Sequence, residues 1–115
     1  MTDERLAKEA SVLMHTYEDW AENRAALLRE KEQCQDEIAS ISERIEDLII
    51  NAPTGDRDKK LHDEITKAKD KRKRLREKIT ETNFQVRDCE LHIKRVELET
   101  RLLLGGIIVD EDEDD

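Results

Sequence analysis

Apolar residues recur along the chain in steps of four and three, on both sides of its single proline, Pro53. Each of the two ladders alternates these steps without a skip, which is the a/d spacing of a coiled coil. The pattern therefore predicts two long helices that pack along a narrow seam. The ladder positions are Leu6, Ala10, Leu13, Tyr17, Trp20, Arg24, Leu27, Lys31, Cys34, Ile38, Ile41, Ile45 and Leu48, and then Leu61, Ile65, Ala68, Arg72, Leu75, Ile79, Thr82, Val86, Cys89, Ile93, Val96, Thr100 and Leu103.

Breaker residues set the expected boundaries of these helices. We expect a first helix over about 3–50, a loop over 51–56 and a second helix over about 57–104. Thr2 or Asp3 would cap the first helix, and Thr54 or Asp56 the second. A glycine pair at 105 and 106 is expected to end the second helix and to open a flexible tail over 105–115. The predicted fold is an all-α antiparallel helical hairpin that forms one structural unit over residues 1–104.

A short connection makes the two helices antiparallel neighbours. Positions whose numbers sum to about 110 then lie opposite each other, which brings Trp20 near Cys89 and Ile93 and Ile45 near residues 61–68. The sequence leaves this register open by one layer.

Polar residues interrupt both ladders. The stems of Arg24, Lys31 and Arg72 are expected to pack along the seam while their charged tips reach solvent or a carboxylate. The alternative is that these charges restrict register and partner choice. Thr82 and Thr100 are the polar uncharged members.

The apolar surface broadens toward the two chain ends. A helix that is apolar on opposite faces is normally covered on both, and scattered surface leucines, the alternative, rarely keep a seven-residue spacing. We therefore expect a partner interface that embeds the hairpin in a four-helix-type bundle, through itself or through other helical proteins. Its expected residues are Met14, Ala21 and Leu28 at e positions, Phe84, Leu91 and Leu98 at f positions, and Leu102 one turn later.

Charge is unevenly distributed along the chain. The formal net charge of −9 argues against a general polyanion binder. One basic strip is nevertheless a candidate for docking nucleic acid, an acidic protein or an import receptor, although it has no interleaved aromatic residue to stack on bases. It comprises Lys67, Lys69, Lys71, Arg72, Lys73, Arg74, Arg76 and Lys78. The alternative is a solvated face, partly neutralised by Glu32, Asp36, Glu37, Glu43 and Glu46 of the first helix.

The end of the chain carries an apolar triplet, Ile107, Ile108 and Val109, directly before acidic residues. Such a segment could add as a strand to the edge of a partner's sheet. It resembles a SUMO-interacting motif, except that the usual fourth aliphatic residue is missing. The alternative is that Ile107 extends the seam and the acidic residues form a solubilising tail.

Catalytic and metal-binding patterns are sparse. Cys89 and His92, with His15 from the other helix, are the only candidate metal ligands, and a cysteine at a d position is more simply a core residue. No glycine-rich phosphate loop and no nucleophile with a nearby base occurs. We therefore expect no enzyme activity, no metal and no cofactor.

Cysteine usage and hydropathy indicate the compartment. The only two cysteines, Cys34 and Cys89, occupy seam positions, which fits a reducing environment. No signal-like opening is present, and no apolar run approaches the roughly 20 residues that span a bilayer. We expect an intracellular protein of the cytoplasm or nucleus without a membrane partner.

Three functions fit these patterns. The preferred hypothesis is a non-enzymatic coiled-coil scaffold or adaptor subunit of a multi-protein assembly. The second is a homodimeric four-helix bundle that binds nucleic acid or an acidic partner through the basic strip. The third is a small helical chaperone or inhibitor that holds clients at its apolar end.

Overall fold

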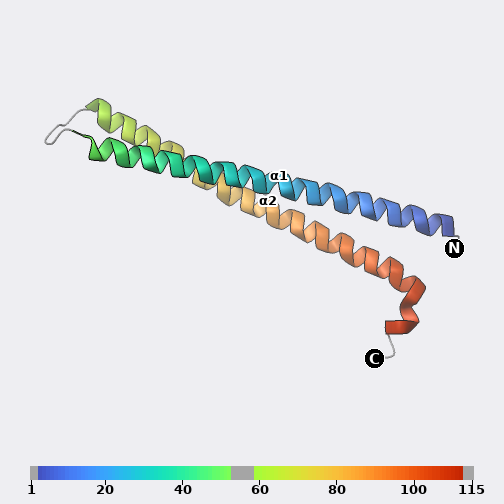
Figure 1. Ribbon diagram of the computed structural model, residues 1–115. Coiled ribbons are helices and arrows are strands. Elements are labelled where there is room, and N and C mark those ends of the chain that lie inside the picture. The colour runs from blue at the N-terminus through green and yellow to red at the C-terminus, as the bar shows by residue number, and fades with distance from the viewer. Residues whose placement is uncertain (1–2, 53–58, 113–115) are drawn as a thin grey trace. The chain divides into compact units, whose positions relative to one another are not determined.

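The computed structural model describes residues 3–52 and 59–112, and the surroundings of side chains up to Gly105. Helix α1 spans Asp3–Ile50 and helix α2 spans Lys59–Asp112 (Figure 1). No strand occurs in either of these ranges. The fold is the all-α helical hairpin that the two heptad ladders predict.

Helix α1 has the bounds expected from the sequence. Asp3 and Glu4 occupy its first turn, where carboxylates interact favourably with the positive end of the helix dipole. At the other end, the Asn51 N–H donates to the Asp47 carbonyl at 2.9 Å. Pro53 follows two residues later and disfavours helical geometry in the residue before it. The predicted caps at residues 2, 54 and 56 lie outside the described residues.

Helix α2 does not end at Leu104, which corrects the predicted boundary. It continues through the glycine pair to Asp112, so residues 105–112 are helical rather than a flexible tail. A glycine costs only about 1 kcal/mol in a helix, and it stops one only where the backbone turns left-handed. Gly105 does not adopt this left-handed conformation. The last part of α2, drawn in red, turns away from the direction of the preceding turns (Figure 1), as glycine pairs allow.

The hairpin divides into two compact units. The terminal unit combines Met1–Ala26 with Gln85–Asp115, and the loop unit comprises Leu27–Phe84. Each unit pairs a segment of α1 with a segment of α2. A residue in a two-helix seam contacts only residues within a turn or two along the seam, on its own helix and on the opposite one. One continuous ladder can therefore form more than one compact unit. The sequence, by contrast, predicts a single unit.

The core is a thin seam that follows the two ladders. Its buried apolar side chains are Cys34, Ile45, Val86, Cys89 and Val96. Every ladder position of α2 is buried or half-buried, and in α1 only Ala10 and Tyr17 are exposed. Thr82 is the most enclosed polar residue, with 3% of its surface exposed. The heptad reading of both helices is therefore confirmed.

Contacts across the terminal unit fix its register. The rings of Trp20 and His92 stack with their centroids 4.0 Å apart and their planes 5° from parallel. One helical turn further along α1, Arg24 Nη2 lies 3.1 Å from Glu90 Oε2. Both pairs lie within about one turn of the predicted alignment.

The loop unit keeps a similar register. Arg72 Nη1 donates to Ser42 Oγ at 3.1 Å, and Lys78 Nζ lies 3.7 Å from Glu30 Oε1. The tips of Arg24 and Arg72 thus reach polar partners beside the seam, as expected for charged residues at a positions. No enclosed side-chain nitrogen or oxygen among the described residues lacks a hydrogen-bond partner.

Candidate helix-docking face

An exposed row of leucines follows α2 in the terminal unit. Leu91, Leu98 and Leu102 keep 60%, 54% and 68% of their surface exposed. Cys89 and Val96, each two positions before one of these leucines, are buried in the seam. Two residues correspond to about 200° around a helix, so α2 is apolar on opposite faces here, and the outer one is uncovered. The leucines predicted for the interface are therefore accessible.

Basic residues that were not among the predicted interface residues border this leucine row. Arg87, Lys94 and Arg101 are exposed and recur every seven residues at b positions, next to the f positions of Leu91 and Leu98. No carboxylate among the described side chains lies within ion-pair distance of these three. Their seven-residue repeat is visible in the sequence, and it is the signal that could have identified them.

The opposite border of the row carries both acidic and basic residues. Arg95 Nε lies 3.1 Å from Glu99 Oε1 on the same helix. Asp88 Oδ2 lies 3.7 Å from His92 Nε2. We call the leucines together with these flanking residues the outer face of α2; it comprises Arg87, Asp88, Leu91, Lys94, Arg95, Leu98, Arg101 and Leu102.

The other predicted interface residues differ in exposure. Met14, in the terminal unit, is 63% exposed, and Phe84, at the end of the loop unit, is 67% exposed. Ala21 and Leu28 are half-buried at the edge of the seam. On α1 of the terminal unit, the predicted interface therefore offers one well-exposed bulky side chain, Met14.

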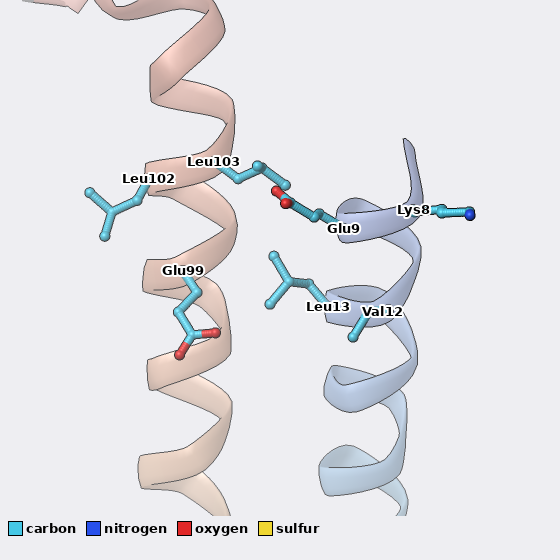
Figure 2. A pocket seen from close by; sticks show the side chains of 7 residues that line it. All are labelled: Lys8, Glu9, Val12, Leu13, Glu99, Leu102 and Leu103. Atoms are coloured by element: carbon cyan, nitrogen blue, oxygen red, sulfur yellow. The ribbon is translucent and has the colours of Figure 1, made fainter. Parts of the chain in front are cut away.

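The seam opens into a hollow of about 600 Å³ near the chain ends of the terminal unit. Leu13 and Leu103 point into the space between the helices (Figure 2), and Leu102 also lines the hollow, although its tip points away from α1. Lys8, Glu9, Val12 and Glu99 complete the lining. Both carboxylates are paired on their own helix, Glu9 with Arg5 and Glu99 with Arg95. Two helices alone do not fill this end of the seam.

Cys89 and His92, the candidate metal ligands, have other roles in the structure. The His92 ring stacks on Trp20, and His15 Nδ1 lies 3.8 Å from Glu18 Oε2 on its own helix. Across the described residues, no three His, Cys, Asp or Glu side chains are arranged to hold a metal. Burial raises the pKa of the Cys89 thiol, and the neighbouring Asp88 carboxylate adds to the shift. Cys89 is therefore a protonated seam residue.

The basic strip lies in the loop unit, and most of its members form no close ion pair within the described residues. All its members are exposed except Arg72, which is half-buried. Among the residues of the strip, only Lys78 forms an ion pair in the described part of the chain, with Glu30. None of them pairs directly with residues 32, 36, 37, 43 or 46. The register brings Glu30 to Lys78, and the expected acidic side chains stay exposed. Lys67 and Lys71 also border an open hollow of about 420 Å³, together with Ser40, Ile41, Arg44, Glu64 and Ala68.

The apolar triplet of the tail belongs to a helix. Residues 107–109 lie within α2, so their backbone is not extended. Strand addition at a partner's sheet edge would therefore require the last turns of α2 to unwind.

Comparisons with known proteins add no relative to this picture. No protein-family model matches the chain, and no curated protein or solved structure matches it either. A search of the described helices for a stretch long and apolar enough to cross a membrane finds none.

Proposed function

We propose that this chain is a non-enzymatic coiled-coil scaffold or adaptor subunit that joins a multi-protein assembly through helix-bundle packing. The observation that carries the proposal is the exposed leucine row of α2, Leu91, Leu98 and Leu102. The opposite side of α2 already packs in the seam, so the row is additional apolar surface that no other part of the described hairpin covers. Exposed apolar side chains that recur along one face of a helix are typical of interaction sites.

The size of the row indicates what it can contribute. Burying one leucine side chain is worth about 1.5–3 kcal/mol, so three give roughly 5–9 kcal/mol before the costs of association. A micromolar complex requires about 8 kcal/mol net. The row can therefore supply a large part of the binding free energy of an interface. The surrounding charged residues would supply the rest and determine which partner binds.

The cysteines support an intracellular location for such an assembly. Cys34 and Cys89 are both free and buried. Buried free thiols are typical of proteins kept in a reducing compartment.

Co-purification from the native cells tests the proposal. The Leu91→Glu/Leu98→Glu variant should lose the proteins that wild type retains, because two carboxylates in the row prevent its burial. The matched control is Ile49→Glu/Ile50→Glu, which changes two exposed isoleucines of the loop unit, 55% and 70% exposed, in the same way. The control should retain the partners. Equal recovery with wild type and with the leucine variant would contradict the proposal.

A second candidate function is binding of nucleic acid or an acidic partner through the basic strip of a homodimer. The observation that favours it is that these exposed lysines and arginines, Lys78 aside, have no carboxylate partner in the described residues. Binding should weaken steeply with salt and disappear when residues 71–74 are changed to glutamate. Sedimentation of the purified chain as a monomer would contradict the dimer on which this candidate depends.

A further inference from the structure

The positive border of the outer face limits which surfaces can cover it. Arg87, Lys94 and Arg101 lie along one side of the leucine row, exposed and without a carboxylate partner among the described side chains. A covering surface brings its own residues within a few ångströms of this border. Positive charges on the covering surface would be repelled by this border, and the repulsion energy would rise as water is excluded from the contact.

A second copy of the same face is a poor match. Two outer faces packed antiparallel would place the b-position cations of one copy against those of the other. Packed in parallel, the cations would meet the row of Asp88, Arg95 and Leu102, which supplies one carboxylate. Helix α1 of a second copy exposes Val12 and Met14, 63% each, and Tyr17, 41%. Val12 and Met14 are two residues apart and so lie on opposite sides of the helix, which leaves no single stripe that could cover three leucines.

A membrane surface is a poor match as well. A helix that lies in a membrane interface needs a broad apolar side, whereas this row is a stripe about one residue wide. The whole chain also carries a formal charge of −9, which anionic lipids would repel. A seven-residue leucine spacing is instead the pattern that seats the knobs of another helix.

We propose that the outer face of α2 binds an amphipathic helix of another protein whose apolar stripe is bordered by acidic residues at seven-residue intervals. The inference rests on the proposed scaffold function and specifies the chemistry of the partner. From Leu91 to Leu102 the row covers three turns, about 16 Å of helix. Acidic side chains on the partner would meet Arg87, Lys94 and Arg101 as the leucines become covered.

Two synthetic peptides test this charge requirement. They share one heptad leucine stripe, bordered in one peptide by glutamates and in the other by lysines, and each is titrated against the full-length chain. We expect the glutamate peptide to bind about tenfold more tightly, because three exposed ion pairs are each worth a fraction of a kcal/mol to about 1 kcal/mol. The difference should shrink in high salt, which screens exposed charges.

A charge-reversal variant provides the matched control. Arg87→Glu/Lys94→Glu/Arg101→Glu changes only exposed positions, so circular dichroism should show an unchanged helix content. The variant should prefer the lysine peptide, and Leu91→Glu/Leu98→Glu should bind neither peptide. Reversal of preference with retained folding would support an acidic partner.

Several outcomes would overturn the inference. Both peptides could bind equally and lose binding on Leu91→Glu/Leu98→Glu. This result would support helix docking, and with it the proposed function, but it would contradict the requirement for an acidic partner. Binding of neither peptide at about 1 mM would reject it as well. A chain that dimerises by itself and loses this on Leu91→Glu/Leu98→Glu would identify a second copy as the occupant. Leucine-dependent binding to vesicles of phosphatidylcholine and phosphatidylserine would identify a membrane.

Discussion

Individual residues show how a narrow seam accommodates charge. Arg24 occupies an a position, and its guanidinium leaves the seam to meet Glu90, with Nε also within 3.2 Å of Oε2. Both side chains remain substantially exposed, 40% and 48%, so water screens the pair. Its contribution should therefore resemble that of a surface ion pair rather than a buried one.

A double-mutant cycle measures that contribution. Arg24→Ala and Glu90→Ala, alone and combined, should give a coupling free energy of about 0.2–1 kcal/mol in urea denaturation. A coupling above about 2 kcal/mol would show that the pair is desolvated, and would contradict the exposed geometry.

The Cys89 thiol should make stability depend on alkaline pH. Its pKa is raised in the folded chain by burial, so above the pKa of an unfolded thiol the unfolded state releases the proton first. The free energy of unfolding should therefore fall as pH rises from roughly 8 to 10. Cys89→Ala should show a smaller fall over the same range, because its other titrating groups are unchanged. Identical pH profiles would contradict a native thiol held protonated by burial.

Sequence patterns predicted the buried residues well and their partners less well. The ladder identified Cys34, Ile45 and Val96 as seam residues because seam burial depends only on helical periodicity. The stacking of Trp20 on His92 depends in addition on register and side-chain rotamers, which one sequence does not determine. The three leucines of the outer face were predicted from the sequence, and the basic border beside them follows the same seven-residue count.

At the scale of the element, α1 contains two isoleucines that have the same side chain but differ in burial. Ile45 keeps 5% of its surface exposed and Ile49 keeps 55%, although both lie on the same helix.

These two positions provide a matched test of the seam. Ile45→Ala should lower the free energy of unfolding by about 2–4 kcal/mol through lost burial and a residual cavity. Ile49→Ala should change it by no more than about 0.5 kcal/mol. Similar costs at both positions would contradict the assigned register of α1.

Helix α2 shows where sequence rules for helix ends fail. Paired glycines are a common stop signal, but they permit a left-handed turn without requiring one. No proline follows Gly106, and the apolar triplet after it remains helical. The glycine pair therefore lowers the local stability of α2 but does not end the helix.

Gly105→Ala tests the continuity of α2. A β-carbon at this position would meet nothing within 4 Å, so the substitution adds no clash. It should stabilise the last turns by about 1 kcal/mol, and their amide hydrogens should exchange about fivefold more slowly. Exchange in α1 serves as the internal control and should not change. Unchanged exchange beyond residue 105 would contradict a helix that passes through the glycine pair.

At the scale of the whole molecule, the two units divide the chemistry of the chain. The terminal unit carries the leucine row, its basic border and an incompletely filled seam end. The loop unit carries the exposed basic strip. A subunit with an apolar docking face and a separate charged surface is suited to positioning other proteins, which is the role proposed for this chain.

Hydroxyl-radical footprinting tests most directly whether another molecule covers the outer face of α2. Side-chain labelling is compared between the isolated chain and the chain in its native assembly, with Ile49 and Ile50 as exposed references. We expect Leu91, Leu98 and Leu102 to be labelled in the isolated chain and protected in the assembly, while the two isoleucines keep their labelling. Equal labelling of the three leucines in both states would contradict the account.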